Sequence, residues 1–207
     1  MNPTKAKLLT ATAQVLREDG FAALSARTIA TRAGVNQALV FYHFGTVAEL
    51  VDAATRQAAD ESADRYREAF AGVTSVGALL ALGRELHERE RAAGNVAMMA
   101  QLMSGAQGSP ELAAAARYAM DRWTREIEAV LGRVLADNPL AGVLDPAGLA
   151  RAVSAGFLGL ELYEGVDPAG AEQALATLER LAVAVDVVGD LGPVARRALR
   201  SRVKNLA

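Results

Sequence analysis

Apolar residues recur every three or four positions along most of the chain, the spacing that places them on one face of an α-helix. Alanine and leucine are abundant, β-branched runs are short, and glycine, proline and asparagine stand between the periodic segments. The pattern therefore predicts an all-α protein. Helices are expected over residues 4–19, 47–71, 75–92, 95–104, 110–136, 146–164 and 168–188, with two short helices within 25–44 and one after Gly189. Ser-Pro or Asp-Pro pairs mark three of these starts, at residues 109–110, 145–146 and 167–168.

The stretch SARTIATRAGVNQALVFYHF, residues 25–44, predicts two short helices joined by a tight turn. Ser25 is suited to cap the first helix, because its hydroxyl can accept a hydrogen bond from a free backbone N–H of the opening turn. Gly34 suits the left-handed stop at the end of that helix. Asn36 is expected to cap the second helix.

Apolar residues on the facing sides of these two helices are expected to pack together: Ile29, Ala30, Val40 and Phe44. Phe21 and Leu24 are expected to cover the small core beneath them. Two helices packed in this way form a helix-turn-helix, which places the start of its second helix in the major groove of DNA. A DNA-binding regulator is therefore the leading interpretation.

Charge is segregated along the chain. The net charge of −2 divides into +3 over residues 1–48, −9 over 49–188 and +4 over 189–207. A basic head (residues 1–48) on an acidic body (residues 49–188) fits a protein whose head alone binds a polyanion. Ordinary scatter of surface charge would look similar. The basic end of the chain is expected to pack on the acidic body rather than to touch DNA.

Several kinds of chemistry are not indicated. The chain has no cysteine, so it has neither disulfides nor a thiolate metal site. No carboxylate cluster stands near His43 at ligand spacing, and the chain has no nucleophile elbow, phosphate loop or dinucleotide fingerprint. We therefore expect no metal, no cofactor and no enzymatic activity. The start of the chain lacks the apolar core of a signal peptide, and no apolar run approaches the ~18 residues of a membrane span, so a cytoplasmic location is expected.

The last two long helices carry apolar stripes that can form a bundle seam. We predict that they meet a second copy of the chain in a four-helix bundle, through Val153, Phe157, Leu160, Leu175, Leu178, Ala182 and Val185. A seam inside one chain explains the same stripes. A DNA-binding function favours the dimer, because one helix-turn-helix rarely grips DNA well alone.

The turn motif, the long helix after it and the helical remainder together resemble the TetR family of bacterial transcriptional regulators. Ala33-Gly34-Val35, a small polar cap and the aromatic pair His43 and Phe44 carry the resemblance over roughly residues 5–52. It implies a helix-turn-helix domain in residues 1–46 and a helical domain for effector binding and dimerisation in residues 47–207. It further implies a homodimer that binds a palindromic operator and is released by a small apolar or amphipathic effector. An activator, or a helical small-molecule-binding protein or enzyme with no DNA-binding role, remains the alternative.

The resemblance also suggests which residues meet DNA. The expected contacts are Arg27, Thr28, Asn36, Gln37, Ala38, Leu39, Tyr42 and His43. Gln37 stands where the family reads bases, and its amide can make paired hydrogen bonds to an adenine edge. Arg27 and Thr28, like Tyr42 and His43, correspond to contacts with phosphates.

A soft apolar patch with a few polar neighbours predicts the effector pocket, because small-molecule sites are mostly apolar and methionine adapts to irregular partners. Plain core packing explains the patch nearly as well. The expected lining consists of His87, Met98, Gln101, Leu102, Met103, Tyr118, Trp123 and Phe157.

Overall fold

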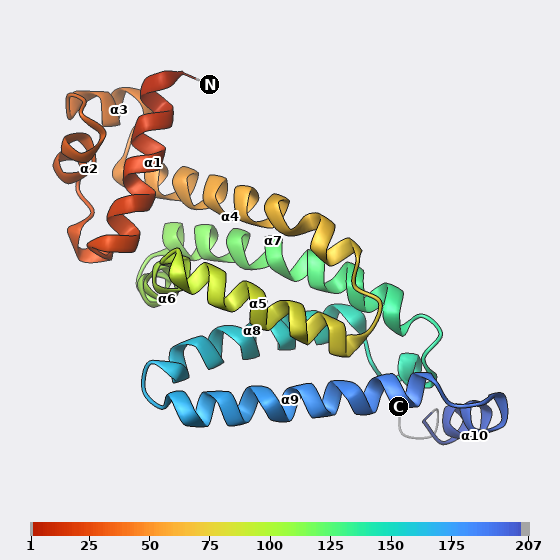
Figure 1. Cartoon of the computed structure of the whole chain (residues 1–207). Coiled ribbons are helices and arrows are strands. Elements are labelled where there is room, and N and C mark those ends of the chain that lie inside the picture. Colours follow the sequence, from red (N-terminus) through yellow and green to blue (C-terminus); the bar gives the residue numbers. More distant parts are fainter. Residues whose placement is uncertain (1, 204–207) are drawn as a thin grey trace. The chain divides into compact units, whose positions relative to one another are not determined.

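The computed structural model describes residues 2–203, and its regular structure over those residues is helical (Figure 1). The α-helices are α1 (Pro3–Glu18), α2 (Ala26–Ala33), α3 (Ala38–Phe44), α4 (Val47–Ala71), α5 (Val76–Ala92), α6 (Asn95–Ala106), α7 (Pro110–Leu135), α8 (Pro146–Glu164), α9 (Pro168–Gly189) and α10 (Pro193–Val203). Two 3₁₀ turns, η1 (Phe21–Ala23) and η2 (Pro139–Gly142), complete them. The prediction of an all-α protein is confirmed, and the predicted helix bounds lie within about two residues of the observed ones.

Helix starts follow the predicted capping chemistry. The Asp145 and Asp167 carboxylates each accept the backbone N–H three residues further on, at 2.8 and 2.9 Å. The Ser109 hydroxyl accepts the corresponding N–H at 3.3 Å. In each case proline occupies the first helical position, where its missing N–H costs nothing.

The chain divides into two compact units. The first unit combines the residues up to Arg65 with Arg89–Arg122, and the second combines Tyr66–Glu88 with the chain from Trp123 onward. The boundary between the units therefore falls inside α4, α5 and α7. The first unit holds not only the three head helices but also α6 and the start of α7. The functional division of the chain at residues 46 and 47 stays a prediction.

Two apolar clusters form the core of the first unit. The head cluster joins α1, α2, α3 and the start of α4, and its fully buried members include Leu8, Ile29, Val40 and Leu50. The second cluster joins the end of α1 to α4, α6 and α7 through Leu16, Val51, Met98, Leu102, Leu112, Ala115 and Ala116. Leu24 packs against both clusters, as expected for a residue that covers the core. Phe21 differs from the prediction, because 37% of its surface is exposed.

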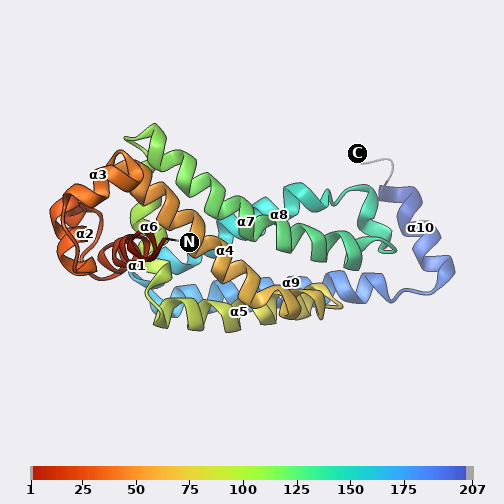
Figure 2. The ribbon, with the colours of Figure 1, turned by 90° about the horizontal axis from the view of Figure 1, so that it is seen from above.

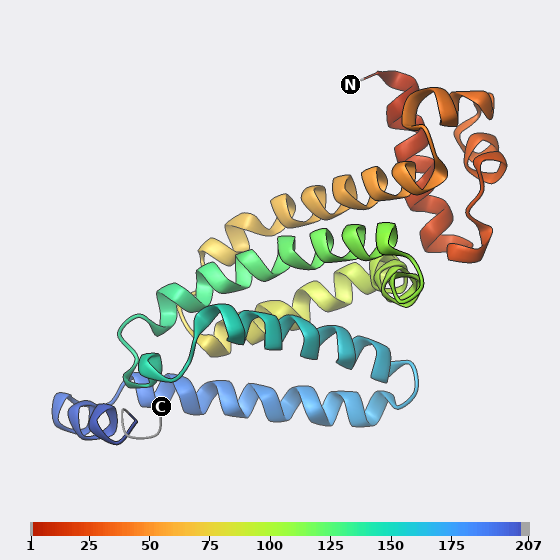
Figure 3. The same cartoon turned by 180° about the vertical axis from the view of Figure 1, so that it is seen from behind.

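The second unit has its own core, formed by Tyr66, Phe70, Val73, Leu79, Leu86, Val130, Leu131, Leu135 and Ala150. Helices α8 and α9 run side by side within this unit (Figure 3). Helix α10 follows α9, lies beyond its end and runs in a different direction (Figure 2), and it packs on η2. There the Arg200 guanidinium donates to the Asp137 carbonyl at 3.2 Å. Among residues 2–203, no helix is long and apolar enough to cross a membrane.

Candidate functional site

The turn between α2 and α3 is built as its sequence predicts. The Ser25 hydroxyl accepts the Thr28 N–H at 3.0 Å, which caps α2. Gly34 ends α2 in the left-handed region, with φ of +65°, where glycine is favoured because it has no Cβ. The Asn36 carboxamide accepts the Ala38 N–H at 2.8 Å. The N-cap residue of α3 is Gln37, one residue later than the predicted cap, Asn36. Asn36 therefore hydrogen-bonds the start of α3 from the position just before the cap.

The inner faces of α2 and α3 fix the position of α3. Ile29, Ala30 and Val40 are buried, and Phe44 packs against the same cluster. The Lys5 ammonium lies over the Phe44 ring, 5.5 Å from its centre, so that α1 holds the end of α3 as well. Because these contacts occupy the inner face, the start and outer face of α3 are left to meet a partner.

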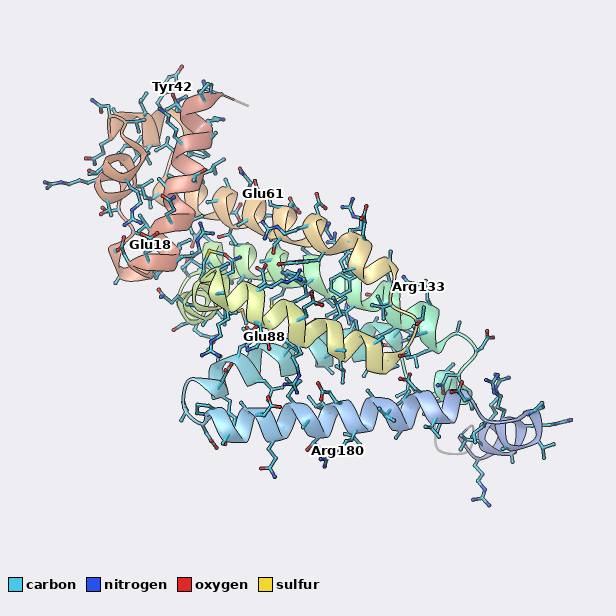
Figure 4. The ribbon with its side chains drawn as sticks, viewed as in Figure 1. Glu18, Tyr42, Glu61, Glu88, Arg133 and Arg180 are labelled. Atoms are coloured by element: carbon cyan, nitrogen blue, oxygen red, sulfur yellow. The ribbon has the colours of Figure 1, made fainter. Side chains whose placement is uncertain are left out.

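The outer face of α3 carries groups that suit a DNA groove. Gln37 and Ala38 are exposed, Leu39 is half-buried, and 80% of Tyr42 is exposed. Tyr42 projects from the end of the head in Figure 4 and meets the His43 ring edge-on, with ring centres 4.9 Å apart. Phe41, which is not among the predicted DNA contacts, is also half-exposed. Phe41 follows the buried Val40 directly and is therefore about 100° further around the helix, which could have indicated its exposure.

Some of the basic side chains of the head make ion pairs or hydrogen bonds within the fold. Arg32 pairs with Glu18 and, at 2.6 Å, with Asp19, so it links α2 to the end of α1. The Arg17 guanidinium donates to Asn95 at 3.2 Å. Arg27 is exposed at the start of α2 and makes no ion pair within the described residues. Of the basic residues in the head, Arg27 is therefore better placed than Arg32 to meet a phosphate.

The residues predicted to line an effector pocket in the first unit have other surroundings. Met98 and Leu102 are buried in the second apolar cluster, and Met103 packs against it. Gln101 accepts the Phe21 N–H at 2.6 Å. The Tyr118 hydroxyl donates to Asp60 at 3.0 Å. These contacts explain all five side chains by packing and hydrogen bonding within the unit.

In the second unit, the predicted pocket residues fall into two groups. The His87 ring lies between Glu161 at 3.0 Å and Glu164 at 2.8 Å, and it meets the Phe157 ring edge-on with centres 6.0 Å apart. Burial alone would lower the pKa of His87, but hydrogen bonds to the two carboxylates outweigh burial and raise it above its usual value. Trp123 instead packs against aromatic rings of α4. The effector pocket stays a prediction.

The residues predicted for the dimer interface divide between the inside and the outside of the chain. Leu175 and Ala182 are buried, and Val185 packs against the core of the second unit. For these three, the structure favours the alternative of a seam inside one chain. Val153, Phe157 and Leu160 are half-buried. Leu178 is the exposed member of the predicted set.

Both α8 and α9 carry exposed apolar positions. Gly156 and Gly159 lie on the open side of α8, where a Cβ at either position would meet no atom within 4 Å. Leu178 and Leu181 are exposed on α9 and, being three residues apart, share one side of it. Val183 lies on the other side of α9, four residues after Glu179, which pairs with Arg84 of α5 at 2.9 Å. The side with Leu178 and Leu181 thus points away from this ion pair.

No group of three or more histidine, aspartate or glutamate side chains suited to a metal occurs within residues 2–203. The geometry of the head, with its capped turn and exposed α3, is that of a helix-turn-helix.

Comparison with known proteins agrees with this geometry. Residues 8–54 match the family model of bacterial regulatory proteins of the tetR family. No curated protein sequence matches the chain. A solved transcriptional regulator from Rhodococcus sp. Rha1 is 27% identical, with 88% of this chain and 96% of that chain covered and a TM-score of 0.69. A protein from Rhodococcus sp. assigned to the TetR-family transcriptional regulators is 24% identical, with 92% and 100% covered and a TM-score of 0.70. A regulator from Saccharomonospora viridis, solved in complex with choline, is 18% identical, with 86% and 95% covered and a TM-score of 0.68.

Proposed function

We propose, from the match of residues 8–54 to the TetR family model and from the fold shared with solved transcriptional regulators, that the chain is a homodimeric TetR-family repressor. In this proposal it binds a palindromic operator and is released by a small effector. The observation that carries the proposal is the head geometry: α3 is held by a buried inner face while its start and outer face are exposed. A protein that works in this way needs no catalytic step and acts in the cytoplasm.

In this proposal α3 enters the major groove with its N-terminal end. The Gln37 carboxamide reads an adenine edge through paired hydrogen bonds, and Ala38 and Leu39 meet thymine methyl groups. Arg27 at the start of α2, and Tyr42 with His43 at the end of α3, contact phosphates on either side of the groove. Phosphate contacts position the head, whereas the Gln37 contact distinguishes sequences.

The dimer face we propose differs from the one that the sequence predicted. In this proposal Gly156 and Gly159 allow a second α8 to approach closely, and Leu178 and Leu181 of α9 supply further apolar contacts. The second copy occupies it by a two-fold arrangement, in which each face meets its own copy. Two heads held by such a dimer can meet successive major grooves, ~34 Å apart for half-sites one helical turn apart.

The effector we propose is a small apolar or amphipathic molecule that binds the helical part of the chain. The choline complex of the Saccharomonospora viridis regulator supports a small organic ligand for this fold. Binding lowers DNA affinity only if the effector prefers head positions that DNA does not accept, with a coupling free energy of typically about 1–3 kcal/mol.

The proposal is tested by selecting binding sites from a library of random DNA duplexes and comparing two head variants on the selected site. Arg27→Ala should weaken binding to all sequences and reduce the salt slope by about 0.9, as expected for one lost phosphate contact. Gln37→Ala should relax preference at one or two base pairs. Arg125→Ala, at an exposed arginine of α7, is the matched control. If Arg27→Ala and Gln37→Ala behave alike, the division into positioning and reading residues is wrong.

A further inference from the structure

We propose that α6 sets the orientation of the DNA-binding head through Gln101, which holds the turn between α1 and α2. The inference rests on the proposed function and adds a positioning residue to it. Sequence reasoning placed Gln101 in the effector pocket, whereas the structure places it against the head. All the contacts involved lie within the first unit.

The central contact is a hydrogen bond between residues 80 positions apart. The Phe21 backbone N–H donates to the Gln101 carboxamide oxygen at 2.6 Å. Gly20, just before it, has φ of +83°, and a Cβ there would lie 2.6 Å from the same oxygen. A Cβ at residue 20 would force the Gln101 carboxamide to move, and the positive φ itself favours glycine. The turn and α6 are therefore fitted to each other.

Two further contacts place the same end of α1 against α6. The Arg17 guanidinium donates to the Asn95 carboxamide at 3.2 Å, at the start of α6. Gly105, one helical turn after Gln101, faces the Phe21 ring, which lies 3.9 Å from the position of a Cβ at residue 105. Helix α6 thus meets the end of α1 and the following turn at three points along its length, as its position beside α1 in Figure 1 indicates.

The end of α1 is joined in turn to α2. Glu18, labelled in Figure 4, and Asp19 both pair with Arg32. Arg32 stands two residues before Gly34, where the turn to α3 begins. A shift of α6 is therefore passed to α2 and α3 by direct contacts. None of these contacts involves the outer face of α3.

The hydrogen bond between Gln101 and Phe21 therefore limits the number of orientations that the head can adopt. While Gln101 holds the turn, the head has one orientation relative to α6. Without that bond the head samples more orientations, and DNA must order it again on binding.

The experiment compares three variants on the DNA site selected for the wild-type protein. Gln101→Met keeps the size of the side chain but removes the acceptor, and Gln101→Glu keeps an acceptor oxygen. Gln107→Met makes the same change at the exposed end of α6 and is the control. In protein labelled with ¹⁵N at its five phenylalanines, the Phe21 amide resonance reports the bond, and Phe21→Leu assigns it.

Gln101→Met should shift the Phe21 resonance and weaken DNA binding about two- to tenfold, the range expected for one hydrogen bond. Gln101→Glu should bind within about twofold of wild type, and Gln107→Met should be unchanged. A shifted resonance with wild-type DNA affinity would overturn the inference and leave the proposed function standing. An unmoved Phe21 resonance would also overturn it, because the bond would then be absent. If the wild-type protein selects no DNA sequence, the proposed function itself fails and the inference falls with it.

Discussion

Replacing Leu181 by alanine should dissociate the proposed dimer without unfolding the protomer. The side chain is 59% exposed on α9, so its removal leaves no cavity in the core of the second unit. In the proposed dimer the partner covers this surface. Val183, which is 56% exposed, lies two residues further on and therefore about 200° around the helix. Val183→Ala is thus a control of similar exposure on the opposite side.

The magnitude follows from the exposed fraction. Leucine to alanine removes three carbon atoms, worth about 0.8 kcal/mol each when buried, or about 2.4 kcal/mol in full. Since 59% of the side chain is available for burial by a partner, each protomer loses about 1.4 kcal/mol of association free energy. A two-fold interface contains the residue twice, so the loss doubles to about 2.8 kcal/mol, which raises the dimer dissociation constant about 100-fold.

Sedimentation velocity over a concentration series measures the dissociation constant, and circular dichroism confirms that the helices remain. Leu181→Ala should move the monomer–dimer transition by about two decades in concentration, and Val183→Ala should leave it in place. Equal effects of the two substitutions would refute the assignment of the interface to this side of α9. A wild-type protein that is monomeric at every concentration would refute the dimer itself.

Two further predictions concern stability. Glu161 and Glu164 raise the pKa of His87 in the folded state, so protonation of His87 stabilises the folded protein. This stabilisation is complete below the unfolded-state pKa, near 6.5, and is lost as the pH rises through the folded-state pKa. Wild type should therefore lose more melting temperature than His87→Gln between about pH 6 and pH 9, and parallel pH profiles would contradict this. Val40→Ala removes two fully buried methyl groups from the head cluster and should lower the free energy of unfolding by about 1.5–3 kcal/mol, as measured by urea unfolding. Ala38→Gly, at the exposed start of α3, should lower it by about 1 kcal/mol or less.

Most of the local structure could be predicted from the sequence, because it depends on neighbours along the chain. The caps at Ser25, Asp145 and Asp167 and the left-handed Gly34 follow from the chemistry of the residues within one helical turn. The burial of Val40 likewise follows from helical spacing. The exposed face of α3 could be predicted for the same reason, since it is what the buried face leaves over.

Contacts between distant residues could not be predicted in this way. Spacing shows that Gln101 shares a face of its helix with Gly105, but not that the turn at Phe21 packs on that face. Arg32 counted toward a basic head, although Glu18 and Asp19 neutralise it in the fold. These outcomes depend on which helices pack together, and sequence periodicity does not specify that.

The apolar stripes of α9 show the same limit. This helix is apolar on more than one side, so helical spacing alone does not show which apolar stripe packs inside the protomer and which one remains exposed. The structure buries Leu175 and Ala182 within the protomer and leaves Leu178 and Leu181 outside. The predicted dimerisation helices therefore stay in the proposal, but with different residues at the interface.

Salt-dependent binding of the wild-type protein to DNA tests the central claim most directly. Fluorescence anisotropy is measured on the duplex obtained by selection and on a scrambled duplex of the same composition, over a series of salt concentrations. The account predicts selected-site binding at least about 10³-fold tighter than binding to the scrambled duplex, with an affinity that falls steeply as salt rises. Equal affinity for the two duplexes at every salt concentration would contradict it.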